Sequence, residues 1–330
     1  MLNKWKKAVI HIESATDSEH FYDKTKRDTE LIEKFKSEEI SREKFMEERL
    51  LIWDVSRDQR LWGTALFLIY KSKRYLVTAR HVVWDKKSAE REFQEEKERA
   101  MSFPENQRRD MLQSALESQQ NRIFSIIFRV PSLEEIISNN EDSIPPFLMN
   151  LGAGLTASHP YTFSPKDIDL AIISLDRGHL YSQFADELLE RGYKPLSYED
   201  INDEPTQEGS EVFTVGFPGS ISFIGTLKRH PAEVKWASDM YSLPAFAFGK
   251  VSMLSEELFY FWADMSVYPG NSGGPVIEDD KLVGIVTGQP TVPSSVDSIR
   301  VRIPFALIVK AKYLFDLIEQ QEQKDNFSPP

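Results

Sequence analysis

The segment Gly270-Asn271-Ser272-Gly273-Gly274-Pro275 places one serine on a glycine-rich backbone that is too flexible for an ordinary core segment. We interpret Ser272 as a nucleophile. Because an alcohol is a poor nucleophile at neutral pH, it needs a histidine to accept its proton and an acid to orient that histidine. It also needs amide groups that stabilise the oxyanion formed when a carbonyl is attacked.

Six histidines could act as the base, and His81 is the strongest candidate. The apolar runs 66–70 and 75–78 flank a polar turn, which predicts a β-hairpin with His81 just beyond its second strand. This position gives the imidazole a rigid support. We expect surface or structural roles for the others, because none has neighbours at metal-ligand spacing; they are His11, His20, His159, His179 and His230. No metal and no cofactor is expected.

The acid is expected in the segment Asp167-Ile168-Asp169-Leu170-Ala171-Ile172-Ile173. A carboxylate directly before a buried apolar strand can be desolvated and held against an imidazole. Asp169 meets this condition better than Asp167. The sequence therefore offers a base, an acid and a nucleophile.

Three motifs resemble the triad motifs of chymotrypsin-fold serine peptidases: TARH ending at His81, DLAII beginning at Asp169, and GNSGGP around Ser272. Their order in the chain, His, Asp, Ser, is also the same. Residues 212–219 and 263–269 are most similar to the bacterial HtrA/Deg-type branch of that family. The segment Trp62-Gly63-Thr64 resembles the family strand whose glycine lies under the active-site histidine.

The resemblance implies the role of each residue and the fold that holds it. Ser272 would be the nucleophile, His81 the general acid/base and Asp169 its orienter, with the backbone N–H groups of Gly270 and Ser272 as the oxyanion hole. The fold class would be an all-β core of two six-stranded antiparallel β-barrels, with α-helical insertions and a C-terminal helix. The first barrel would bring His and Asp, and the second Ser.

The sequence departs from the family pattern at several positions. Digestive relatives have an aspartate before the serine that pairs with a newly cut N-terminus; here the residue is Asn271, so we expect no activation by N-terminal cleavage. Arg80 and Val82 replace the usual residues on either side of the histidine, and neither change is expected to affect the chemistry. HtrA-like proteins usually carry a C-terminal PDZ domain, for which we expect no room after residue 320.

Charge and apolar spacing predict two helical insertions in the first barrel, near residues 23–50 and 85–122, the second broken near Pro104. Each is either a solvated flap or a docking arm for a regulatory protein. We predict an N-terminal barrel over residues 1–200, a C-terminal barrel over 201–330, and a final helix over 304–322 that begins at Pro304. Strands of the second barrel are predicted at 211–216, 245–254, 258–263, 276–277, 282–286 and 298–303.

Composition limits the setting in which the protein works. The 330 residues include no cysteine, which is ordinary for a reducing compartment, so we expect a cytoplasmic protein. The apolar stretch after the basic N-terminus is too short for a signal peptide, and no run is long enough to span a membrane. The net charge of −12 argues against general affinity for nucleic acid.

The primary specificity pocket is expected between residues 264–268 and 283–289, with Ser266, Ile285, Val286 and Thr287 binding substrate. The edge near Ile285 to Thr287 would pair with the substrate backbone by strand addition. Ser266 stands where trypsin-like relatives have an aspartate, so we favour a small or medium apolar P1 residue. If Asp264 points into the pocket, a basic P1 residue is the alternative.

Three functions fit these features. The first is a cytoplasmic serine endopeptidase that cuts a specific protein partner, and the helical insertions and the expected lack of a PDZ domain favour it. The second is an HtrA-like quality-control protease that acts on unfolded chains. The third is a catalytically silent pseudoprotease that binds extended peptides.

Overall fold

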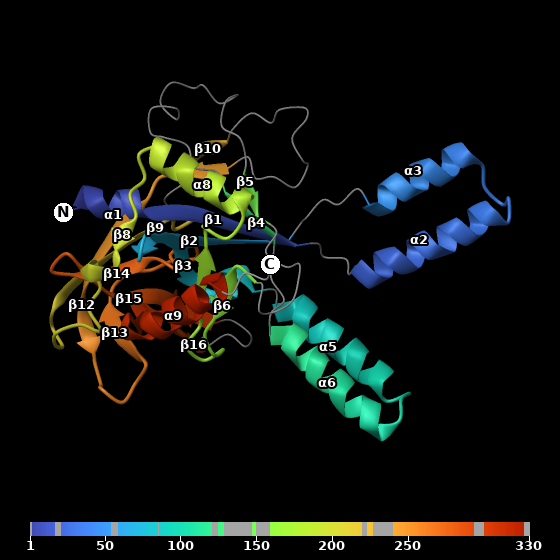
Figure 1. The fold of residues 1–330 in the computed structure, drawn as a ribbon. Coiled ribbons are helices and arrows are strands. Elements are labelled where there is room, and N and C mark those ends of the chain that lie inside the picture. The colour runs from blue at the N-terminus through green and yellow to red at the C-terminus, as the bar shows by residue number, and fades with distance from the viewer. Residues whose placement is uncertain are drawn as a thin grey trace.

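The computed structural model shows a β-rich body from which two helical hairpins project (Figure 1). The described residues are 2–16, 21–53, 59–84, 86–120, 125–128, 147–149, 159–219, 223–226, 240–293 and 300–326. None of the helices in these ranges is long and apolar enough to cross a membrane.

The N-terminal part of the chain forms one sheet of eight strands. Its strands run in the order β5-β4-β1-β2-β3-β7-β6 with antiparallel neighbours, and β8 pairs with β2 in parallel. Among the described residues this path has two ends, β5 and β6, and does not close into a barrel. The strands are β1 (Val9–Thr16), β2 (Gln59–Tyr70), β3 (Lys73–Ala79), β4 (Ser125–Phe128), β5 (Phe147–Met149), β6 (Tyr161–Phe163), β7 (Leu170–Ser174) and β8 (Leu196–Ser197).

The hairpin predicted before His81 is confirmed as β2 and β3. Its tip is a two-residue turn, because Tyr70 pairs with Lys73. Lys71 and Ser72 both have positive φ, 45° and 67°, which is the backbone that the twist of a two-residue hairpin requires. The centre of each strand is fully buried, so both strands of this hairpin are packed within the core.

The C-terminal part contains a closed barrel of six antiparallel strands in the order β12-β13-β18-β15-β14-β9. This confirms the predicted second barrel. Two short ribbons, β10 with β11 and β16 with β17, lie outside it. The strands are β9 (Glu211–Gly216), β10 (Phe223–Thr226), β11 (Met240–Ser242), β12 (Ala245–Met253), β13 (Tyr260–Asp264), β14 (Pro275–Glu278), β15 (Lys281–Gly288), β16 (Thr291–Pro293), β17 (Arg300–Arg302) and β18 (Phe305–Lys310).

The prediction of a helix over residues 304–322 was wrong at its start. Residues 305–310 form β18, which pairs with β13 on one side and β15 on the other, and the final helix α9 begins only at Lys312. Strand pairing that closes the barrel overrides the helical spacing of the apolar residues in this segment. Of the strand predicted at 298–303, residues 300–302 form β17, which pairs with β16 outside the barrel, and residues 298–299 lie outside the described residues.

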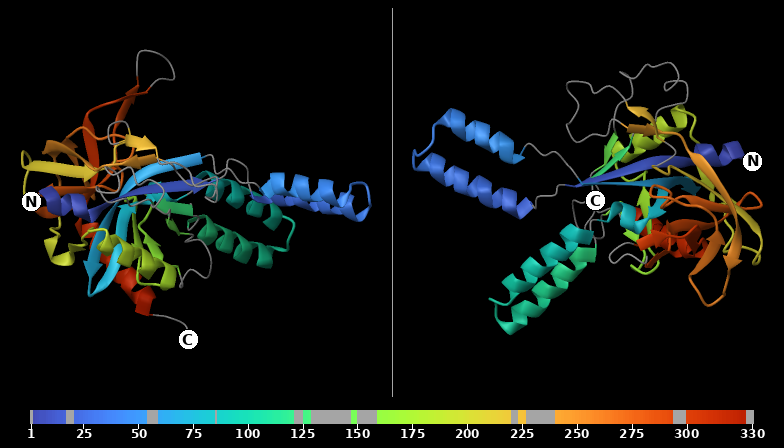
Figure 2. Two further views of the ribbon diagram at one scale, coloured as in Figure 1. Left: turned by 90° about the horizontal axis from the view of Figure 1, so that it is seen from above. Right: turned by 180° about the vertical axis from the view of Figure 1, so that it is seen from behind.

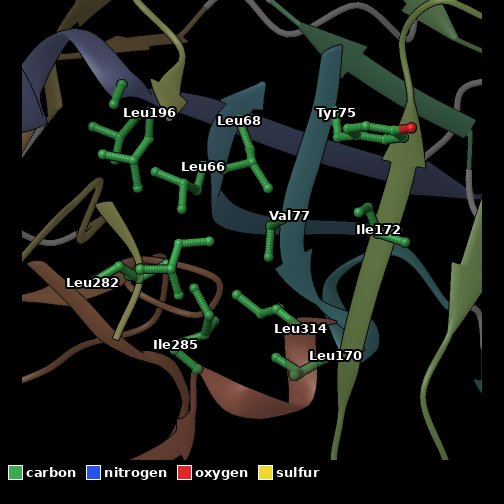
Figure 3. Packing of buried hydrophobic residues seen from close by; sticks show 14 of the residues in the cluster. Leu66, Leu68, Tyr75, Val77, Leu170, Ile172, Leu196, Leu282, Ile285 and Leu314 are labelled. Carbon is green, nitrogen blue, oxygen red and sulfur yellow. The ribbon is translucent and has the colours of Figure 1, made fainter. Parts of the chain in front are cut away.

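One apolar cluster joins the N-terminal sheet, the barrel and α9 (Figure 3). Leu66, Val77 and Ile172 of the sheet contribute to it, together with Ile285 of the barrel and Leu314 of α9. All five side chains are fully buried. Burial of this kind stabilises a protein by about 25 cal/mol per Å² of apolar surface, so the cluster fixes the sheet and the barrel relative to each other.

Both segments predicted to be helical insertions form helical hairpins that project from the body (Figure 2). Leu31 and Phe45 are buried between the helices of the first hairpin, and Arg49 is paired with Asp28 at 3.0 Å. The helices in the described ranges are α1 (Leu2–Ala8), α2 (Phe21–Lys36), α3 (Arg42–Trp53), α4 (Arg80–Val83), α5 (Lys86–Ala100), α6 (Glu105–Gln120), α8 (His179–Glu190), the 3₁₀ turn η3 (Tyr198–Asp200) and α9 (Lys312–Asn326).

Candidate active site

Strand pairing places Asp169 beside His81. His81 lies in α4, a single helical turn directly after β3, and Asp169 directly precedes β7. Ala79 at the end of β3 pairs with Leu170 at the start of β7, and the amide of Arg80 donates to the carbonyl of Asp169 at 2.9 Å. The register between β3 and β7 therefore places His81 next to Asp169.

Both carboxylate oxygens of Asp169 bind His81. The ring nitrogen Nδ1 lies 2.6 Å from Oδ2, and the backbone amide of His81 donates to Oδ1 at 2.8 Å. Because a carboxylate only accepts hydrogen bonds, Nδ1 carries the proton and Nε2 of the neutral ring remains the proton acceptor. Asp169 has φ of +59°, a conformation that few non-glycine residues adopt.

Gly63 and Gly273 bring the Ser272 loop against the strands that support His81. A Cβ at Gly63 would lie 2.6 Å from Cγ1 of Val82, the residue after His81, and 3.1 Å from the carbonyl oxygen of Ser272. A Cβ at Gly273 would lie 2.0 Å from the carbonyl oxygen of Thr64 and 3.0 Å from the amide of Ala79. Only glycine permits approaches this close, so the serine backbone sits beside the histidine turn.

The Ser272 loop uses its amides in a pattern that leaves two of them available. Asn271 donates to Tyr268, Gly273 to Val286 and Gly274 to Asn271, all backbone bonds of 2.8–2.9 Å. The amides of Gly270 and Ser272 have no acceptor among the residues that the structure describes. Gly270 has φ of +103°, and a Cβ there would lie 2.1 Å from the carbonyl oxygen of Phe217.

Asn271 is a structural part of this loop that the sequence did not reveal. Its side chain is buried, and Oδ1 accepts the amide of Tyr268 at 3.0 Å while its own amide donates to Tyr268. The side chain thus closes the turn that leads to Ser272. The sequence indicated only that this position lacks the aspartate of the digestive relatives.

Arg80 also has a role that the sequence did not reveal. Its side chain is buried, and the guanidinium lies 4.7 Å from the ring centre of Trp84 and 5.1 Å from that of Phe163. One guanidinium nitrogen donates to the carbonyl of Ser164 at 2.7 Å. Burial lowers the pKa of Arg80, and nearby Asp169 opposes that shift. These contacts brace the turn that carries His81.

A pocket of about 760 Å³ lies beside His81 and Asp169. Trp262 and Thr287 of the barrel line it, together with Lys86 at the start of α5. The pocket is therefore bounded by the sheet, the barrel and one helical insertion. Asp264 is exposed and is not among the residues that line it.

Two of the expected substrate-binding residues already use their backbone N–H and C=O groups in hydrogen bonds within the protein. Val286 donates to Gly274 and accepts from Gly273, and Ile285 is fully buried between β14 and β18. A substrate strand cannot pair with either, so this part of the prediction is corrected. Of the four expected residues, Thr287 lines the pocket beside His81, whereas Ser266, Ile285 and Val286 do not, and neither does Ser272. Ser266 is exposed.

Of the other described histidines, His11 on β1 lies beside Phe217, which follows β9. Its ring centre is 5.2 Å from that of Phe217. His159 is buried and stacks on Tyr161, and His179 is exposed at the start of α8. His20 and His230 lie outside the described residues.

We expect His11 to make stability depend on pH. Burial lowers the pKa of His11 from 6.5 to about 4. Between these values the unfolded chain binds the proton and the folded chain does not, so stability is full above pH 6.5 and is lost as pH falls through 4. Urea unfolding at several pH values should show wild type losing about 1–3 kcal/mol more than His11→Gln between pH 7 and pH 4. Equal losses in both proteins would contradict this assignment.

The chain resembles known proteins in three comparisons. The family model described as "Trypsin-like peptidase domain" matches residues 63–285. A relative from Arabidopsis thaliana, named "Putative protease Do-like 12, mitochondrial", is 30% identical over 120 residues, which are 36% of this chain and 19% of that protein. The match thus spans about a fifth of the relative's length. A crystal structure of the thermostable serine protease AL20 from an extremophilic microorganism superposes with a TM-score of 0.44 and 7% identity over 98% of this chain and 100% of that one.

Proposed function

Because the chain belongs to the trypsin-like peptidase family, we propose that it is an active serine endopeptidase that hydrolyses peptide bonds through an acyl-enzyme. The observation that carries this proposal is the pair of bonds from His81 to the Asp169 carboxylate, next to a serine loop whose amides at 270 and 272 lack acceptors among the described residues. We propose that the N-terminal sheet, whose path does not close among the described residues, corresponds to the first barrel over residues 1–200. The closed barrel is then the second, over residues 201–330.

In the proposed mechanism, Ser272 Oγ attacks the scissile carbonyl while His81 Nε2 takes its proton. Asp169 holds the ring and stabilises the imidazolium that forms. The amides of Gly270 and Ser272 donate to the oxyanion, which matters most in the transition state. His81 then protonates the leaving amine, and a water activated by the same nitrogen releases the acyl group.

We propose that the substrate backbone pairs with residues 287–289 and that the enzyme prefers a small or medium apolar residue at P1. The lack of an acid at Ser266 supports this preference. Digestion of a proteome-derived peptide library, read by mass spectrometry of the new termini, tests it. Cleavage after Ala, Val or Leu is expected, whereas cleavage after Lys or Arg would show that Asp264 selects the substrate.

The first choice of substrate is a specific protein in the cytoplasm, consistent with a chain that has no cysteine. The Do-like relative supports the second choice, a quality-control protease. Unfolded casein distinguishes them, because a quality-control enzyme should degrade it broadly and a specific endopeptidase should leave it largely intact. Binding of extended peptides without turnover would indicate the silent pseudoprotease.

We also propose that a regulatory protein docks on the helical insertions. On α3, Met46, Leu50 and Leu51 expose 50%, 67% and 69% of their surface, and Met46 and Leu50 are four residues apart, on one face of the helix. The first helix of the other insertion begins at Lys86, three residues after the end of the turn that carries His81, and Lys86 lines the pocket. A protein bound to this second insertion would therefore act on the active site over a short distance.

Excision of the first insertion tests this docking. Thr16 of β1 pairs with Gln59 of β2, so residues 17–58 can be replaced by Asn-Gly, which favours a tight hairpin turn. We expect the shortened protein to fold and to react with serine-directed probes as wild type does, but to lose co-precipitation of a partner from its native cell extract. Loss of the fold would mean that the insertion supports the core instead.

A further inference from the structure

Thr64 of β2 contacts the Ser272 loop with both its side chain and its backbone. Its hydroxyl oxygen lies 2.7 Å from the carbonyl oxygen of Gly270, and its backbone amide donates to the carbonyl of Ser272 at 2.8 Å. The residue is fully buried. No other described side chain donates a hydrogen bond to a carbonyl of residues 270–272.

The direction of the hydroxyl bond is fixed by its surroundings. The amide of Phe217 points at the Thr64 oxygen at 3.1 Å and must be the donor in that contact. A hydroxyl has one hydrogen and two acceptor sites, so its hydrogen is left for the carbonyl of Gly270. The carbonyl of Thr64 in turn accepts from the Thr78 hydroxyl at 2.8 Å, which ties the residue to β3.

Hydrogen bonds hold both peptide groups that include Gly270, the one before it and the one after it. The carbonyl of Pro269 accepts the amide of Gly219 at 2.9 Å, and because C=O and N–H point in opposite directions in a trans peptide, the Gly270 amide points away from Gly219. The next carbonyl, that of Gly270, is held by Thr64. The second plane, between Gly270 and Asn271, is held at both ends: Thr64 donates to its carbonyl, and its amide donates to the carbonyl of Tyr268 at 2.9 Å. Glycine at φ +103° has many alternatives, so loss of the Thr64 bond leaves this plane held at one end only.

We propose that Thr64 is a positioning residue for the oxyanion hole, whose hydroxyl holds the Gly270 peptide so that the amides of Gly270 and Ser272 face the substrate carbonyl. The expected effect on kcat rests on the proposed peptidase function. The expected effect on the orientation of the Gly270 carbonyl rests on the loop geometry alone. It predicts that loss of the hydroxyl lowers kcat with little effect on KM, because the oxyanion exists only along the reaction path.

The test compares Thr64→Val, which keeps the shape and removes the hydroxyl, with Thr64→Ser, which keeps the hydroxyl. Thr162→Val is the matched control, because the buried Thr162 hydroxyl donates to Gln321 on α9 and not to the Ser272 loop. Thr64→Ala replaces the valine variant if that one does not fold. We would determine crystal structures of the variants and measure their rates of inactivation by a fluorophosphonate. We would also measure kcat and KM on a peptide that the wild type cleaves.

We expect Thr64→Val to show a turned Gly270 carbonyl and a roughly 10- to 100-fold loss in inactivation rate and kcat, with Thr64→Ser and Thr162→Val close to wild type. An unchanged loop with kinetics equal to those of Thr162→Val would overturn the proposal. If wild type does not react at all, the peptidase function fails, and the crystal structures still decide the role of Thr64: a turned carbonyl supports it and an unchanged one refutes it.

Discussion

Replacement of Ser272 by alanine should reduce peptide hydrolysis by roughly 10⁵- to 10⁶-fold and leave the thermal unfolding temperature nearly unchanged. The alcohol oxygen supplies the bond that defines the acyl-enzyme, and the serine side chain receives no hydrogen bond that holds the loop together among the described residues. His81→Ala should cost as much, because the alcohol cannot lose its proton without the imidazole.

The double variant Ser272→Ala/His81→Ala distinguishes a catalytic unit from two separate effects. Groups that act as a unit lose nearly everything with the first replacement, so the double variant should be little slower than either single one. Multiplicative losses would mean that the two residues do not act together. His179→Ala is a suitable control, since that histidine is exposed at the start of α8 and outside the site.

Asp169→Asn should lower kcat by about 10⁴-fold with a small change in KM. An amide at this position can donate to Nδ1, which would move the ring proton to Nε2 and remove the acceptor that Ser272 needs. The folded structure should persist, because the asparagine oxygen can still accept the His81 amide that Oδ1 accepts in wild type.

Asp167→Asn is the matched control for this change. Asp167 is two residues away, exposed, and lines the same pocket, but among the described residues the carboxylate that binds His81 is that of Asp169. Its replacement should therefore cost far less than that of Asp169. Equal losses at the two positions would show that charge near the pocket matters rather than the orientation of the imidazole.

Local sequence signals located the elements that position the site. The polar turn at residues 71–74 and the apolar runs on both sides predicted the hairpin before His81, and the carboxylate before β7 was found by the same logic. Five of the six barrel strands were also predicted. These elements are short, bounded by polar or glycine residues and strongly apolar, so local pattern and tertiary environment agree.

The errors arose where tertiary pairing decides the structure. Apolar residues at 307, 308, 311 and 314 fit a helical face, yet 305–310 is the strand that closes the barrel. Likewise, nothing in the local pattern shows that the backbone of Val286 is already bound to the Ser272 loop. Arg80 could have been found from its spacing to Trp84, because side chains four residues apart on one helical turn meet.

The most direct test of the central claim is labelling of purified full-length protein by a fluorophosphonate probe, followed by mass spectrometry of the modified peptide. The probe reacts with an activated serine and needs no knowledge of the substrate. We predict that wild type is labelled on Ser272, that labelling is lost in His81→Ala, and that Asp167→Asn keeps it. Absence of labelling in folded wild type, or labelling at another serine, would contradict an active site built from His81, Asp169 and Ser272.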